Sequence, residues 1–186
     1  MAAVTRWHRG AADQRGFTLI EALFAIGILS GGLLTLALVL TTGVKKLADA
    51  PVDLIAKQKA SEAVEAVFQA RDSGILTWSQ IRNVQGGSGA DGGVFLDGPQ
   101  QVRVAGADGL INTADDGAVE TILLPGNDGL LGTADDQTLA LTQYTREIQI
   151  RDINVVLRSI VVTVTYQTAS GGRRTYVLTT YISSYS

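Results

Sequence analysis

The first part of the chain changes along its length from uniformly apolar to amphipathic. Residues 22–44 contain no charged side chain, and charged residues return from Lys45 onward. A stripe at seven-residue spacing runs through this later part, with two valines beside it: Leu47, Leu54, Ser61 and Phe68, with Val64 and Val67. Such spacing is typical of the buried face of a helix. We therefore expect one long helix over residues 17–72.

Two local signals bear on the course of this helix. Pro51 has no backbone N–H to donate, which predicts a kink or a local break. The run Asp72-Ser73-Gly74 is typical of a helix end. The amphipathic half should then pack against a soluble domain, because its apolar face needs a partner.

The last third of the chain alternates with a period of two. Ile148 and Ile150 share one face of residues 144–150, and residues 155–166 form a β-branched run of strand length. After a turn at 169–172, residues 175–183 alternate again, so the last two runs predict a β-hairpin. The expected fold class is α+β, with the long N-terminal helix packed on an antiparallel β-sheet head at 73–186.

The apolar half of the helix, about 17–44, is long enough to cross a membrane, since a bilayer needs roughly 20 apolar residues. Three arginines and one aspartate precede it (Arg6, Arg9, Arg15 and Asp13), and Lys45 and Lys46 follow it. This slight bias favours a cytoplasmic N-terminus and an extracytoplasmic head. A cleaved secretory signal fits poorly, because no small-residue A-x-A site follows the run.

Composition narrows the function classes. The formal net charge is −3, so a general affinity for nucleic acid is not expected. The chain has no cysteine and a single histidine, His8. The lack of cysteine excludes disulfides and thiolate metal sites. If the N-terminal segment is removed, His8 goes with it, and Ser–His–Asp chemistry is excluded as well. We expect a structural protein and not an enzyme.

The segment Arg15-Gly16-Phe17-Thr18-Leu19-Ile20-Glu21 places a carboxylate just inside the apolar run. An ionisable group at mid-bilayer costs on the order of 2.5–3.5 kcal/mol, and such residues are functional candidates by default. Together with the basic leader, this segment resembles the cleavage and methylation site of type IV pilins and pseudopilins. Within that family, residues 21–34 look most like minor pilins of the PilV type.

The resemblance implies a course of processing and assembly. A prepilin peptidase and N-methyltransferase would remove the leader, residues 1–16, by cutting after Gly16, and would methylate the new N-terminal residue, Phe17. Glu21 would then meet the N-terminal amine of a neighbouring pilin or pseudopilin subunit. The chain would be a single-pass inner-membrane protein first, and part of a cell-surface or periplasmic filament afterwards.

Two alternatives stay open. Within the family, the chain is either a minor pilin or a pseudopilin of a type II secretion system. From another class, it is a permanently membrane-anchored surface domain, with Glu21 reaching the interface and with loops that bind calcium or a ligand. Cleavage after Gly16 distinguishes this last class from the others.

Two acidic segments in the head repeat one another. Residues 106–116 read GADGLINTADD and residues 126–136 read GNDGLLGTADD, with three differences. One difference exchanges Asn112 for Gly132, the two residue types that best tolerate a positive φ. We therefore expect a left-handed conformation at this position in both loops.

The repeated loops admit two interpretations. No Lys or Arg lies between Arg103 and Arg146, and Ca²⁺, which takes 6–8 oxygen ligands, would relieve the repulsion among the carboxylates. The preferred ligands would be Asp108, Asp115, Asp128 and Asp135, with Asp116 and Asp136 as second choices. The other interpretation is a pair of hydrogen-bonded aspartate turns without metal.

Overall fold

The computed structural model describes residues 16–84 and 92–185. The predicted leader therefore lies outside the described residues, apart from Gly16. By its internal contacts the chain divides into two units, 1–44 and 45–186, and each is described by itself.

A single helix, α1 (Leu19–Asp72), crosses the boundary between the two units. It begins two residues later than predicted and ends at the predicted stop. Of the kink or local break predicted at Pro51, the break is wrong, since the helix is assigned without interruption through this residue. A proline removes one backbone hydrogen bond, and the remaining bonds on either side keep the helix together.

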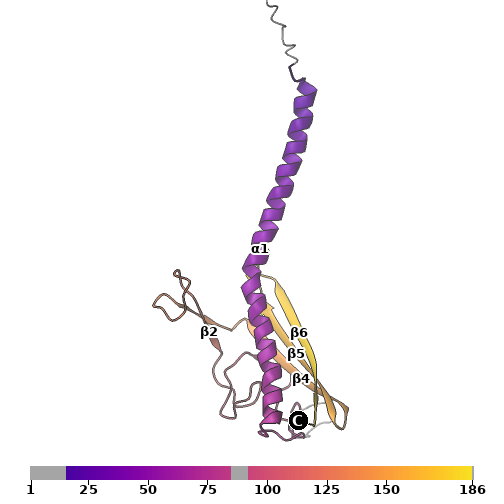
Figure 1. Cartoon of the computed structure of the whole chain (residues 1–186), viewed down its shortest axis with the longest axis vertical. Coiled ribbons are helices and arrows are strands. Elements are labelled where there is room, and N and C mark those ends of the chain that lie inside the picture. Colours follow the sequence, from indigo (N-terminus) through magenta and orange to yellow (C-terminus); the bar gives the residue numbers. More distant parts are fainter. Residues whose placement is uncertain (1–15, 85–91, 186) are drawn as a thin grey trace, which may run out of the picture. The chain divides into compact units, whose positions relative to one another are not determined.

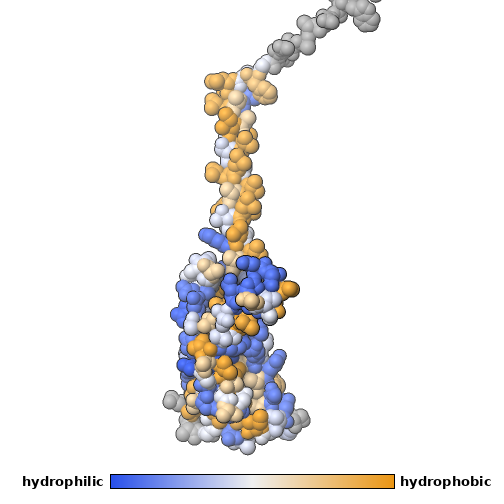
Figure 2. Space-filling view, turned by 90° about the vertical axis from the view of Figure 1, so that its left-hand side faces the viewer, coloured by the Kyte–Doolittle hydropathy of each residue, from blue (hydrophilic) through white to orange (hydrophobic). Residues whose placement is uncertain are grey.

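In the first unit, every residue of the helix is exposed and most are apolar (Figure 2). This helix is long and apolar enough to cross a membrane by length and composition. A helix that is apolar on all sides and has no protein against it suits a lipid environment.

The second unit contains an antiparallel sheet of four strands: β1 (Gln100–Gln101), β4 (Tyr144–Asn154), β5 (Leu157–Gln167) and β6 (Arg173–Ser183). They lie in the order β1-β4-β5-β6, and Figure 1 shows β4, β5 and β6 side by side. The three long strands and the β5–β6 hairpin were predicted. The α+β fold class is confirmed: the later part of α1 packs on an antiparallel sheet.

A separate two-stranded ribbon was not predicted. It pairs β2 (Thr121–Leu124) with β3 (Gln137–Ala140) and carries the second acidic segment between them. Figure 1 shows it standing away from the main sheet. We call residues 121–140 the hairpin arm.

The helix face that meets the sheet agrees with the predicted stripe only in part: Val67 is buried, and Val64 and Phe68 pack against the core. Half of the buried helix residues are alanines, in the set Asp49, Ile55, Ala56, Lys59, Ala60, Ala63, Val67 and Ala70. Leu47 and Leu54 are instead 75% and 66% exposed, and Ser61 is exposed too. Small side chains let the helix approach the sheet closely, and a search for large apolar residues overlooks them.

The inner face of the sheet supplies the other half of the core. Ile148, Ile160, Val162 and Val164 are fully buried, as the alternation predicted. The rings of Tyr144 and Tyr166 stack at 5.8 Å between centroids. Burial, with a hydrogen bond from its hydroxyl to Asp53, raises the pKa of Tyr166 to about 12.

Candidate functional site

The predicted cleavage position lies immediately before α1. Gly16 and Phe17 are exposed and precede the first helical residue. Both are therefore accessible within the described part of the chain. Thr18 follows them, and its backbone carbonyl accepts a hydrogen bond from the Ala22 amide at 3.1 Å.

Thr18 caps the helix, a role that sequence reasoning missed. Its Oγ1 accepts a hydrogen bond from the backbone N–H of Glu21 at 3.3 Å, which satisfies one of the amides that a helix start leaves unpaired. The spacing Thr18-x-x-Glu21 is that of a capping box, and this pattern was visible in the sequence. Glu21 also lies in the first turn, where the helix dipole favours a negative charge.

The carboxylate of Glu21 is exposed, and no cation of the described residues forms an ion pair with it. Among the described residues, its contacts are those at the helix start. Its exposure makes the carboxylate accessible to a cationic partner from another molecule.

Hydroxyl groups along the apolar part of α1 are satisfied within the helix. Ser30, Thr35 and Thr41 donate to the backbone carbonyls four residues earlier at 2.7, 2.8 and 2.8 Å. Hydrocarbon offers no other partner for such groups. The polar residues of this segment are therefore compatible with a position in lipid.

The two acidic segments, now called the first loop (106–116) and the second loop (126–136), have the same internal hydrogen bonds. In the first loop, Asp115 accepts from the Asp108 amide at 3.3 Å and from Thr113 Oγ1 at 2.9 Å. In the second loop, Asp135 accepts from the Asp128 amide at 3.3 Å and from Thr133 Oγ1 at 2.7 Å.

The other aspartates close tight turns in the same way in both loops. Asp108 accepts from the Leu110 amide at 2.8 Å, and Asp128 accepts from the Leu130 amide at 2.9 Å. The last aspartate of each loop accepts from the backbone amide at the Asn112/Gly132 position. Asp116 accepts from Asn112 at 2.8 Å, and Asp136 accepts from Gly132 at 2.6 Å. All six carboxylates therefore accept hydrogen bonds from their own loop.

These bonds shift the acidity of two carboxyl groups. The Thr113 hydroxyl, with the Asp108 amide, holds the pKa of Asp115 below its ordinary value of 3.8, although some desolvation opposes the shift. The Thr133 hydroxyl lowers the pKa of Asp135 in the same way. Each loop therefore favours the ionised form of its central aspartate.

The predicted left-handed position is confirmed in both loops. Asn112 has φ of 61° and Gly132 has φ of 87°. The first glycine of each loop is required for another reason. A Cβ on Gly106 would lie 2.3 Å from the carboxyl carbon of Asp115, and one on Gly126 would lie 2.3 Å from that of Asp135.

The first loop is docked on the head. Leu110 is 3% exposed and Asn112 is fully buried. The Asn112 side chain accepts a hydrogen bond from Nε of Arg146 at 2.9 Å and donates to the Arg146 carbonyl at 3.2 Å. Burial lowers the pKa of Arg146, while the charges of Asp116, Glu120 and Glu62 oppose that shift.

The second loop makes no such contact. Gly132 has no side chain to offer to the head, and Leu130 and Leu131 are 62% and 64% exposed. The same local structure is thus held against the head in one copy and presented to solvent in the other.

The structure gives the calcium interpretation no support. Among residues 16–84 and 92–185, no three His, Cys, Asp or Glu side chains are grouped so as to hold a metal ion. The six predicted ligands accept hydrogen bonds from amides and hydroxyls of their own loops, as the aspartate-turn interpretation expects. Calcium binding stays an untested prediction.

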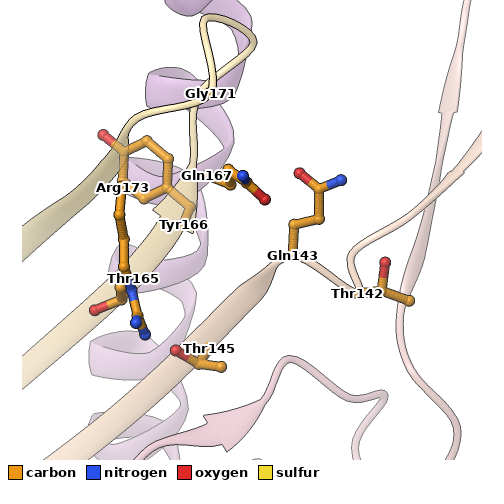
Figure 3. Close-up of a pocket in the computed structure, with 8 residues that line it drawn as sticks. All are labelled: Thr142, Gln143, Thr145, Thr165, Tyr166, Gln167, Gly171 and Arg173. Atoms are coloured by element: carbon orange, nitrogen blue, oxygen red, sulfur yellow. The ribbon is translucent and has the colours of Figure 1, made fainter.

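Two neighbouring hollows lie at the base of the hairpin arm. The larger, about 330 Å³, is lined about equally by polar and apolar groups, and its lining includes Thr145, Thr165 and Arg173 (Figure 3). The smaller, about 140 Å³, is lined mainly by apolar groups, with Val52, Leu139, Ala140, Tyr144 and Ala169 among them. Gln143 and Gln167 line both hollows, so the two are adjacent.

Comparison with curated proteins and with solved structures finds no match. A family model described as the prokaryotic N-terminal methylation motif matches residues 12–42. The matched residues include Gly16, Phe17 and Glu21 and most of the apolar helix, but less than half of the chain. The N-terminal segment, with its membrane-compatible helix, therefore fits a membrane-anchored precursor of the type IV pilin or pseudopilin kind.

Proposed function

We propose that the chain is a structural subunit, a minor pilin or a pseudopilin, of a type IV pilus-like filament. A prepilin peptidase cuts it after Gly16 and methylates Phe17. The mature chain is held in the inner membrane by the apolar part of α1 and is then assembled with other subunits.

The observation that carries the proposal is the methylation motif at residues 12–42, together with an apolar helix segment, 19–44, that no described residue buries. Burying a whole apolar helix needs either lipid or other helices of the same kind. A filament supplies those helices after the chain leaves the membrane. The head has its own hydrophobic core between Ile55 and Ile182, so it does not need the first unit for its packing.

The experiment is an intact-mass measurement on the chain extracted from membranes of cells that contain an active prepilin peptidase. The expected mass lacks residues 1–16 and carries one additional methyl group. Gly16→Val should abolish both changes, because a branched side chain does not fit a site built for glycine. Finding only the full-length mass for the unaltered chain would favour a permanently anchored surface protein instead.

The motif is shared by pili and secretion systems, so the subunit type needs a different test. Deleting the gene from a strain that has both systems distinguishes them. A minor pilin is expected to change surface piliation, whereas a type II secretion pseudopilin is expected to change protein export and leave piliation intact.

A further inference from the structure

The hairpin arm presents apolar side chains that the rest of the head leaves uncovered. Leu123, Leu130 and Leu131 are 59%, 62% and 64% exposed. The first loop shows how the same motif behaves when it has a partner, since its Leu110 is 3% exposed. An apolar tip on a projecting two-stranded ribbon, which is marginal by itself, is typical of an interaction site.

The charges of the arm limit the chemistry of its partner. Residues 121–140 contain Asp128, Asp135 and Asp136 and no Lys or Arg. The partner surface should therefore combine an apolar hollow with a nearby cation.

The base of the arm offers both features. The apolar hollow beside Val52, Leu139 and Ala169 adjoins the larger hollow, which Arg173 lines. In Figure 3, the guanidinium of Arg173 lies near Thr165 and Thr145, and the amides of Gln143 and Gln167 point toward one another. Arg173 is exposed and forms no ion pair with a described residue.

We propose that the arm of one copy docks in the paired hollows at the base of the arm of the next copy. The leucines of the second loop enter the apolar hollow, and its carboxylates face Arg173. The second loop lies at the tip of the arm, whereas Leu139 and Ala140 at its base line the smaller hollow. The contact therefore joins two different surfaces head-to-tail, and contacts of this type build rings or helical filaments. This proposal rests on the proposed function and names the partner surface for it.

The absence of cysteine from the chain allows a clean cross-linking test on the full-length protein. Two differently tagged copies are expressed together, one with Asn127→Cys in the second loop and the other with Gln143→Cys in the hollow. In the matched control pair, the first copy carries Ala107→Cys and keeps Asn127. Ala107 is the equivalent exposed position of the first loop. A short bismaleimide should link the Asn127→Cys and Gln143→Cys copies and leave the control pair unlinked.

A second variant tests the charge complementarity. Arg173→Glu should lower the yield of the cross-linked dimer at least roughly tenfold, because it places like charges across the contact. Lys57→Glu, an equal change at an exposed helix position, should leave the yield unchanged.

The intact mass of the same samples separates the two proposals. If the leader has been removed and no cross-linked dimer forms, the arm contact is overturned and the proposed function stands. The same holds if the control pair gives an equal yield of dimer. No dimer in a sample that keeps its leader contradicts the proposed function itself, and the arm contact with it.

Discussion

The first and second acidic loops differ at three of their positions and yet have opposite relations to the head. Their internal hydrogen bonds are the same, from the turn at Asp108 or Asp128 to the final aspartate pair. Leu110 is nevertheless buried and Leu130 exposed. The loop conformation is thus encoded locally, and docking depends on a tertiary contact that only one loop has.

That contact is the pair formed by Asn112 and Arg146. Arg146 is 1% exposed, and Asn112 both accepts from and donates to it. Gly132 satisfies the same backbone conformation but leaves no side chain to bind. The Asn112 side chain is therefore one contact that holds the first loop on the head, beside the buried Leu110 and the hydrogen bond from the Leu96 amide to the Asn112 carbonyl.

The largest effect is expected from removing the cation beneath the first loop. Arg146→Ala removes the guanidinium that donates to the Asn112 side-chain oxygen, leaves the backbone carbonyl at 146 in place and opens a cavity, so the free energy of unfolding of the head should fall by about 3 kcal/mol. Chemical unfolding of the full chain in detergent measures this. Arg173→Ala, at an exposed position, should stay within about 0.5 kcal/mol. Similar losses in both variants would show that Arg146 does not hold the first loop.

Exchanging Asn112 and Gly132 between the two loops tests how much the Asn112 side chain contributes to docking of the first loop. Asn112→Gly keeps the positive φ and loses both contacts with Arg146, which should cost about 2 kcal/mol. Gly132→Asn introduces a residue that tolerates this φ at a solvated position, and it should change stability by less than about 0.5 kcal/mol. Thermal unfolding compares the two. Equal shifts would mean that docking depends on something other than the Asn112 side chain.

A smaller effect concerns acidity. The pKa values of Asp115 and Asp135 are lowered below 3.8, so each ionised carboxylate stabilises its loop above that pH. This stabilisation is lost as the pH falls through the folded pKa. An NMR titration of the side-chain carboxyl carbons should place both midpoints below 3.8.

Thr133→Val provides the matched control for this titration. It removes the hydroxyl that contributes most to the shift of Asp135, so that midpoint should rise toward the ordinary value while the Asp115 midpoint stays low. Parallel movement of both midpoints would contradict a local origin of the shifts.

No effect is expected from calcium. The aspartate oxygens of both loops already accept hydrogen bonds, and the described residues contain no grouping of acidic side chains suited to a metal ion. The melting temperature should therefore be the same in calcium and in chelator. Bound calcium would stabilise the fold by about 2.7 kcal/mol at a hundredfold excess over Kd, so a rise with calcium and not with magnesium would restore the calcium interpretation.

The sequence predicted what depends on local pattern. The long helix, the three long strands and the left-handed residue of each loop follow from spacing and residue type. The helix face was predicted only in part, at Val64, Val67 and Phe68. Half of the buried helix residues are alanines, which the spacing of large apolar residues does not indicate. The docking of the first loop could not be predicted, because it depends on Arg146, a charged residue that pattern reasoning places on the surface.

The central claim is that α1 joins this chain to a filament after processing, and the most direct measurement is the amount of mature chain in filaments sheared from cells. The unaltered chain, beginning at methylated Phe17, should be found in that fraction. Glu21→Ala removes the exposed carboxylate and should confine the processed chain to the membrane, because a buried amine of the neighbouring subunit then has no partner. Equal amounts of Glu21→Ala and unaltered chain in the filament fraction would contradict the account.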